Sequence, residues 1–306
     1  MRVSVASAPV SFGVFEMTPE GADVITPDDM VSIVAEAGYG GIDLGPLGYL
    51  GCGEQLRRRL VGARLELAGG WVQLPFSDDD AFADSLATLR AVLRQFVIAA
   101  EAGPVRLPLP TLADDGSALR RSAPGRGAAV DPVSPRLRDR LYANVERAAN
   151  VVRAVGLEPT FHHHVGTYVE SSEEIDGLLN AVDIGMTLDT GHLVIAGGDP
   201  VEAVRLWGDR VNHLHVKDVD LGKLQRVLAA GGGMKEVWSS GAFVAFGAGD
   251  VDLSTVLSML DDREYDGWIV VEQDVLNNCP DVALDEFVAQ RADDQRNNRA
   301  ALRAWA

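Results

Sequence analysis

Apolar and polar residues follow one another along the chain in two different rhythms. Short β-branched or apolar runs, typical of buried strands, are separated by longer stretches with the apolar spacing of amphipathic helices. The predicted strands are Val3–Ala8, Gly41–Leu44, Leu65–Val72, Val105–Leu109, Glu158–His164, Gly185–Asp189, Val211–Val216 and Trp268–Glu272. The predicted helices are Asp28–Ala37, Glu54–Ala63, Asp84–Ala100, Pro135–Ala154, Glu173–Val182, Pro200–Trp207, Leu253–Leu260 and a final one from Val282 to Trp305. This alternation indicates a parallel sheet with helical crossovers.

Eight such units in 306 residues predict one closed (β/α)8 barrel, a TIM barrel, as a single domain spanning residues 1–306. An open doubly wound sheet is the structural alternative, and it usually carries a Gly-rich phosphate turn after its first strand. Here the first strand is followed by Pro9-Val10-Ser11-Phe12-Gly13. The absence of that turn favours the barrel.

Two stretches break the rhythm. Residues 111–134 are rich in Gly, Ala, Ser and Pro, and residues 218–250 contain Gly231-Gly232-Gly233 and Gly247-Ala248-Gly249. Both follow predicted strands, so both are expected to lie over the C-terminal mouth of the barrel. Long loops in compact domains are usually lids, binding loops or disordered segments, and the sequence leaves these roles open.

Composition and charge restrict the class of protein. The chain is 47% hydrophobic and 24% charged, with a formal net charge of −18. Nucleic-acid binding needs a basic surface, so a nucleic-acid partner is not expected. Two distant cysteines, Cys52 and Cys279, predict no disulfide framework. No run approaches the roughly 18 to 20 apolar residues of a membrane span, and the N-terminus does not resemble a signal peptide. We expect a soluble cytoplasmic protein without membrane attachment.

Histidine is confined to one part of the chain. All six histidines lie between residues 162 and 215: His162, His163, His164, His192, His213 and His215. Side chains of a strand alternate between its two faces. His162 and His164 therefore share one face of the fifth strand, and His213, His215 and Lys217 share a face of the seventh. Asp189 ends the sixth strand and Glu272 the eighth.

The C-terminal ends of barrel strands converge on one mouth. Four successive strands therefore bring His162 or His164, Asp189, His215 and Glu272 to a common point. Imidazole and carboxylate ligands together suit Mn²⁺, Co²⁺, Fe²⁺, Zn²⁺ or Mg²⁺. The alternative is a buried network of His–Asp pairs without metal, although burying unpaired ionisable groups costs several kcal/mol. Signatures of a GxSxG hydrolase or a phosphate-binding loop are absent from the sequence.

Several segments together resemble a known family. They are FHHHVGT (Phe161–Thr167), LDTGH (Leu188–His192), HLHVKD (His213–Asp218), FGAGDVD (Phe246–Asp252) and GWIVVEQD (Gly267–Asp274). These motifs resemble the inosose dehydratases of myo-inositol catabolism, which belong to the xylose-isomerase-like sugar isomerases, epimerases and dehydratases. The N-terminal APVSFGVFE and the GIDLGPLGYLG segment around Asp43 are similar to the same family. The resemblance thus covers nearly the whole chain.

The resemblance implies a barrel with one divalent metal, Mn²⁺ being favoured, held by four side chains from strands five to eight. Asp189, His215 and Glu272 match three of these ligands. Most members of the superfamily have a glutamate in the fourth place, where this chain has His162, with His164 or water as substitutes. That replacement removes a carboxylate base that the epimerases use, so it disfavours a two-base epimerisation. Family members commonly associate, so a homo-oligomer is expected.

The implied reaction is metal-assisted elimination of water from a cyclic keto-polyol such as 2-keto-myo-inositol, through an enediolate. The metal ligand Glu272 is included among the catalytic residues. His164 is the expected base, and His192 would bind substrate or orient Asp189. Lys217 would stabilise the developing oxyanion or form a salt bridge to a strand carboxylate. The expected substrate-binding residues are Trp71, which would otherwise be core, and His213.

Two alternatives to this hydro-lyase stay open at this point. The first is isomerisation or epimerisation of a ketose or keto-sugar, which shares the metal and the enediolate but keeps the oxygen. The second is a sugar-binding or partner subunit without catalysis.

Overall fold

Parallel pairing joins the strands of the main sheet into a continuous ring. The structure is a computed structural model that describes residues 3–277 and 282–305. The sheet order is β3-β2-β1-β11-β8-β7-β6-β5-β4. Only Ala68 separates β3 from β4, so these two form one interrupted strand that pairs with β2 on one side and β5 on the other. The ring therefore has eight strands, and the predicted (β/α)8 barrel is confirmed. The strands are β1 Ser4–Ser7, β2 Gly41–Ile42, β3 Glu66–Leu67, β4 Gly69–Leu74, β5 Leu109–Asp114, β6 Thr160–His162, β7 Gly185–Asp189, β8 Val211–Val216 and β11 Trp268–Val271.

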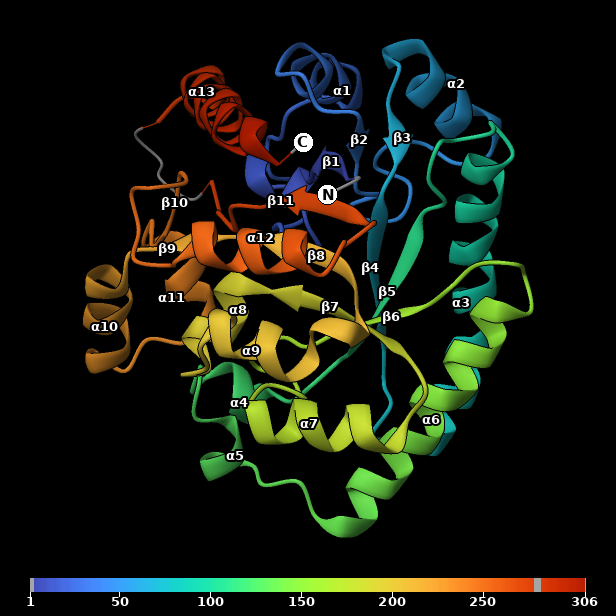
Figure 1. Cartoon of the computed structure of the whole chain (residues 1–306), viewed down its shortest axis with the longest axis vertical. Coiled ribbons are helices and arrows are strands. Elements are labelled where there is room, and N and C mark those ends of the chain that lie inside the picture. Colours follow the sequence, from blue (N-terminus) through green and yellow to red (C-terminus); the bar gives the residue numbers. More distant parts are fainter. Residues whose placement is uncertain (1–2, 278–281, 306) are drawn as a thin grey trace.

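Helices surround the ring, as Figure 1 shows for α3, α6, α7, α9 and α12. Their bounds are α1 Pro27–Glu36, α2 Glu54–Ala63, α3 Asp79–Ala100, α6 Pro135–Arg153, α7 Ser172–Ala181, α9 Pro200–Trp207, α12 Leu253–Asp262 and α13 Leu284–Ala301. Single 3-10 turns lie at Pro9–Phe12, Gly208–Arg210 and Leu302–Ala304. Thr26 caps α1, and Ser171 forms a capping box with Glu174 at α7, as Ser and Thr do at helix starts. None of the described helices is long and apolar enough to cross a bilayer.

The fourth barrel strand lies further along the chain than the prediction Val105–Leu109. Strand β5 runs from Leu109 to Asp114, whereas Val105 is 90% exposed. The reason is pairing, because Leu112 lies between Val72 of β4 and Phe161 of β6 and is fully buried there. Local hydrophobicity did not distinguish the apolar run at residues 105–109 from the one at residues 109–114. The shift places Asp114 at the C-terminal end of a barrel strand.

The two irregular stretches contain short elements that were not predicted from the sequence. The first holds α4 (Ala118–Arg121) and α5 (Gly127–Val130), and the second holds α10 (Leu221–Ala229), α11 (Met234–Ser239) and a hairpin of β9 (Asp218–Val219) with β10 (Phe243–Val244). In Figure 1 the arrows of β7 and β11 point toward the side where α8 (Thr190–Ile195), α10, α11 and this hairpin gather. The second stretch thus lies beside the C-terminal ends of those strands.

Buried polar side chains order both stretches. Arg120 is fully buried and donates hydrogen bonds to the carbonyls of Asp131 and Thr167 and to the Glu174 carboxylate. The Asp218 carboxylate accepts backbone N–H bonds from positions 219, 247, 249 and 251. Buried charges need such partners, so each stretch is tied to the barrel at its base.

Candidate metal and catalytic site

Four side chains from neighbouring strands converge inside the mouth of the barrel; we call His162, Asp189, His215 and Glu272 the quartet. His162 Nε2 lies 3.1 Å from His215 Nδ1 and 3.3 Å from Asp189 Oδ2. Glu272 Oε2 lies 2.9 Å from His215 Nδ1. All four side chains are buried. The structure therefore brings together the four residues that the sequence proposed as metal ligands.

Opposite charges set the protonation of the quartet. Burial would raise the pKa values of Asp189 and Glu272, but neighbouring cations hold both well below their usual range, chiefly Lys217 at Asp189 and His215 at Glu272. Burial alone would lower the pKa of His215, yet the Glu272 carboxylate outweighs it and raises that pKa to about 10. Burial lowers the pKa of His162. The quartet thus presents two carboxylates, which attract a cation.

Lys217 lies next to these carboxylates. Its ammonium donates hydrogen bonds to Asp189 Oδ2 and Glu272 Oε2, and Nζ lies 3.4 Å from Asp274 Oδ1. The side chain is buried, which would lower its pKa, but the three carboxylates raise the pKa well above the usual value. The salt bridge considered for Lys217 from the sequence is therefore present, and the same ammonium lines the cavity described below.

The donor set of the quartet fits a divalent metal ion. Two ligand atoms that each lie about 2.1 Å from a tetrahedral ion are separated by roughly 3.4 Å, close to the separations found here. His162, Asp189 and His215 offer donor atoms that all lie within 4.8 Å of one another. Mixed nitrogen and oxygen ligands suit Mn²⁺, Co²⁺, Fe²⁺ or Zn²⁺. The same convergence would also suit a network of hydrogen bonds without metal. In such a network the Lys217 ammonium balances the negative charge of Asp189 and Glu272.

A second group of three lies beside the quartet: His164, His192 and Asp274. The rings of His164 and His192 lie with their centroids 3.6 Å apart and are tilted by 40° to each other, and His192 Nε2 lies 3.1 Å from Asp274 Oδ2. His164 Nδ1 lies 2.7 Å from the Val165 carbonyl oxygen. Donor atoms of the three also approach within 4.8 Å of one another. His164 therefore groups with His192 rather than with the quartet, which favours His162 as the fourth ligand.

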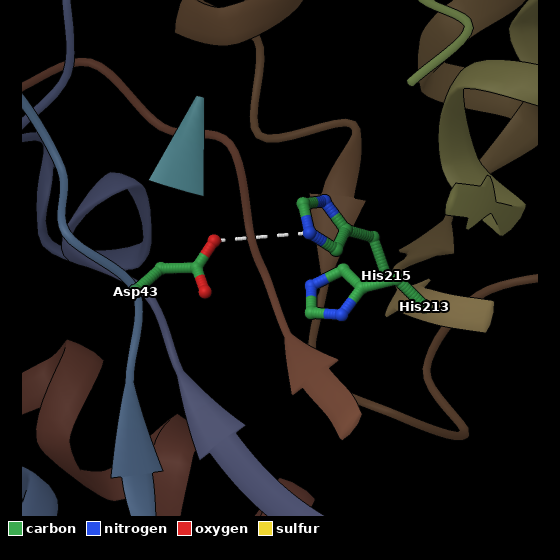
Figure 2. Close-up of side chains that lie close together, drawn as sticks. All are labelled: Asp43, His213 and His215. Carbon is green, nitrogen blue, oxygen red and sulfur yellow. Dashed lines mark ion pairs between the residues drawn. The ribbon is translucent and has the colours of Figure 1, made fainter. Parts of the chain in front are cut away.

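A third group of titratable side chains, Asp43, His213 and His215, comes from strands that lie across the barrel from each other. Figure 2 shows Asp43, which follows β2, pointing toward the rings of His213 and His215 from β8. His215 Nε2 lies 3.8 Å from Asp43 Oδ2, and burial raises the pKa of Asp43 to about 7. Gly69 leaves room for this contact, because a Cβ there would lie 3.0 Å from His213 Nε2 and 3.2 Å from Asp43 Oδ1.

A cavity of about 350 Å³ opens onto the quartet, a size typical of small-molecule sites. Trp71 lines it, with its ring 5.2 Å from the His162 ring and 5.0 Å from the His164 ring. Residues of both irregular stretches, including Arg121, Met234 and Trp238, also line it. His213, expected to contact substrate, is fully buried and lies outside the set of lining residues.

Five acidic residues that line the cavity were not predicted as site residues: Glu16, Asp43, Asp114, Asp115 and Asp274, of which Asp43, Asp114 and Asp274 are buried. Asp274 had a usable signal, because it follows Glu272 by two residues and strand alternation puts both on one face. Asp114 was hidden by the misplaced fourth strand. Asp43 was noted only as part of a motif, since nothing local shows that it faces β8.

The comparisons with known proteins agree with this architecture. The family model described as xylose isomerase-like TIM barrel matches residues 31–303. The inosose dehydratase of Geobacillus kaustophilus is 28% identical over 278 residues, 88% of this chain and 86% of that protein. The inosose dehydratase of Clostridium perfringens is 26% identical over 281 residues, 89% of this chain and 90% of that protein. The resemblance expected from the sequence motifs is confirmed.

Solved structures show the same fold at lower identity. A probable 3-DHS dehydratase from Bacillus anthracis superposes with a TM-score of 0.67 at 17% identity, covering 99% of this chain and 98% of the other. A D-allulose 3-epimerase from Methylomonas sp. gives a TM-score of 0.69 at 15% identity, covering 100% and 98%. At these identities the match concerns the fold alone.

Proposed function

The chain belongs to the xylose isomerase-like TIM barrel family, and from this membership we propose that it is a metal-dependent dehydratase of a cyclic keto-polyol. It is an enzyme whose curated relatives are inosose dehydratases, so 2-keto-myo-inositol is the proposed substrate. The observation that carries the proposal is the quartet, four donor side chains converging beside the closely spaced rings of His164 and His192 at one cavity.

The quartet would hold one divalent ion, which as a Lewis acid polarises a ketone oxygen and stabilises negative charge that develops there. His162, Asp189, His215 and Glu272 are its proposed ligands. Histidine in place of a third carboxylate, at the position of His162, leaves one fewer anionic base in the cavity. This composition supports a reaction with a single imidazole base over a two-carboxylate epimerisation.

His164 is the proposed base. Its Nδ1 faces the Val165 carbonyl oxygen at 2.7 Å, so Nδ1 carries the ring hydrogen and the Nε2 lone pair is left to accept a proton. The C–H electron pair moves into a carbon–carbon double bond, and the hydroxyl on the next carbon leaves. The imidazolium returns the proton to that oxygen, so water and an unsaturated ketone are formed without any oxidant.

Four further side chains position these events. Asp274 holds His192 at 3.1 Å, and the His192 ring in turn lies against the His164 ring, with centroids 3.6 Å apart, and restricts its orientation. The Lys217 ammonium reaches the cavity and offers hydrogen bonds to oxygen atoms that gain charge. Trp71 presents its ring beside both histidines as an apolar wall for the C–H face of a ring substrate.

The test is turnover of 2-keto-myo-inositol by the purified protein with Mn²⁺ or Co²⁺. Dehydration gives a conjugated product with new ultraviolet absorbance and loss of one water, which proton NMR in D₂O also resolves. EDTA treatment should abolish both signals, and adding metal back should restore them. A product that retains all its oxygens would mean isomerisation or epimerisation, and binding without α-proton exchange would mean a non-catalytic protein.

A further inference from the structure

The cavity holds a buried carboxylate that the proposed reaction does not use. Asp114 ends β5, is 1% exposed and lines the same cavity as the quartet. Its two oxygens have different surroundings. Oδ2 accepts backbone N–H bonds from Gly116 and Tyr168, each at 2.9 Å. Oδ1 is buried and has no hydrogen-bond partner among the residues that the structure describes.

The carboxylate cannot easily turn to satisfy that oxygen elsewhere. Gly116 has a φ of +62°, and a Cβ there would lie 2.1 Å from the Gly166 carbonyl oxygen, so the two loops are packed backbone against backbone. The two N–H donors come from these two loops, one after β5 and one after β6. Oδ1 is therefore held in place as an unused acceptor, and a buried acceptor without a partner is costly.

A partner from the substrate would remove this cost. The neighbouring strand supplies Trp71 and Gln73, which line the cavity too, and Trp71 Nε1 donates to Gln73 Oε1 at 3.3 Å. Carboxylate and carboxamide groups beside an aromatic ring suit a molecule with several hydroxyls and an apolar C–H face. The Arg120 guanidinium does not supply a partner, because it donates to the Asp131 and Thr167 carbonyl oxygens and to the Glu174 carboxylate.

We propose that Asp114 is a specificity-determining residue, which accepts a hydrogen bond through Oδ1 from a hydroxyl of a polyol bound with its ketone at the quartet. This inference rests on the proposed function for the position of the ketone, and it names the substrate class more closely. A ring that carries a hydroxyl on the side away from the ketone satisfies Asp114. A deoxy ring leaves the acceptor buried and unpaired.

Asp114→Asn tests this with little disturbance of the fold. The carboxamide oxygen can accept the N–H bonds of Gly116 and Tyr168. The NH₂ group then takes the place of Oδ1, so a donor replaces the acceptor at that position. Assayed at pH 8, where the Asp114 carboxyl is ionised in the folded protein, the variant should raise KM for 2-keto-myo-inositol about 10- to 100-fold, as expected for one charge-assisted hydrogen bond, with kcat changed much less. The wild type should prefer the keto-polyol to a deoxy analogue, and the variant should lose that preference.

Asp131→Asn is the matched control, because Asp131 belongs to the same loop, contacts Ser117 and Tyr168, and lies outside the cavity lining. It should leave KM unchanged. The inference would be overturned if KM were unchanged in Asp114→Asn. It would also be overturned if the variant lost the same factor in kcat/KM for the keto-polyol and for the deoxy analogue. Calorimetric binding of myo-inositol, which has no ketone, separates the two proposals. Weaker myo-inositol binding by Asp114→Asn than by the wild type supports the inference even if no dehydration occurs. Equal binding by the wild type and the variant overturns the inference even if dehydration is found.

Discussion

His162 Nε2 and His215 Nδ1 lie 3.1 Å apart inside the barrel, although 53 positions separate the two residues in the chain. They come from β6 and β8, and Asp189 of the strand between them lies within 3.7 Å of both nitrogens. Two imidazole nitrogens that face each other beside carboxylates suit a divalent metal ion, and both are proposed here as its ligands. This relationship leads to the first prediction.

His162→Ala should lose the divalent metal. Removing an outer-shell partner typically weakens a metal site about 10- to 100-fold, so loss of a ligand should weaken it by at least on the order of 100-fold. The measurement is metal content by elemental analysis after dialysis, together with Mn²⁺ titration. His164→Asn is the matched control on the same segment and should keep its metal. Equal metal content in both variants would exclude His162 as a ligand.

His164→Asn should retain metal and lose catalysis. A positioned general base contributes about 10²- to 10⁴-fold to a rate, so kcat for dehydration should fall by that factor while the melting temperature stays close to that of the wild type. Exchange of the substrate α-proton in D₂O should slow in parallel, because the same imidazole removes it. Exchange at the wild-type rate would show that another group is the base, with His192, whose ring lies against His164, the first to examine.

Asp114 should make stability depend on pH in a defined direction. Burial raises its pKa to about 7, assisted by Asp115 and opposed by Arg120 and by the backbone N–H bonds of Tyr168 and Gly116. In the unfolded chain an aspartate titrates near pH 3.9. The folded protein therefore keeps this proton over the range from about pH 4 to pH 7 in which the unfolded chain releases it. The free energy of unfolding falls as pH rises through that range.

Asp114→Asn has no such proton to lose. The melting temperature of the variant relative to the wild type should therefore rise between pH 5 and pH 8, by an amount equivalent to at most a few kcal/mol. Thermal unfolding at both pH values measures this difference directly, and other titrating groups cancel because they are shared. A constant difference between the two proteins at pH 5 and pH 8 would mean that Asp114 is ionised throughout.

Gly69→Ala should destabilise the protein and disturb the centre of the barrel. The added Cβ would lie 3.0 Å from both His213 Nε2 and the Leu109 carbonyl oxygen, and 3.2 Å from Asp43 Oδ1. Overpacking of this kind costs about 1–3 kcal/mol. Gly62→Ala in α2 is the control, because nothing lies within 4 Å of its added Cβ, and alanine there should stabilise by about 0.5–1 kcal/mol. Denaturant unfolding measures both, and equal stabilities would contradict the expected clash.

The sequence by itself determined the barrel and three members of the quartet, Asp189, His215 and Glu272, and it left His162 or His164 as the fourth. Strand and helix periods are local properties, so the alternation of β7, β8 and α9 could be predicted to the residue. The alternation of side chains along a strand put His213, His215 and Lys217 on one face. Because parallel barrel strands all end at one mouth, Asp189 and Glu272 had to meet them. No knowledge of loops was needed for that step.

Only the tertiary structure decided which groups meet across the barrel. The fourth strand was misplaced because two apolar runs compete locally, and pairing of Leu112 with Val72 and Phe161 selects the second. Asp43 faces His215 through the width of the ring, and this contact depends on the closure of the sheet. Burial raises the pKa of Asp114 and leaves its Oδ1 without a partner among the described residues, and this burial arises from loops packed against each other. Such contacts depend on register and packing between distant segments, which no local pattern encodes.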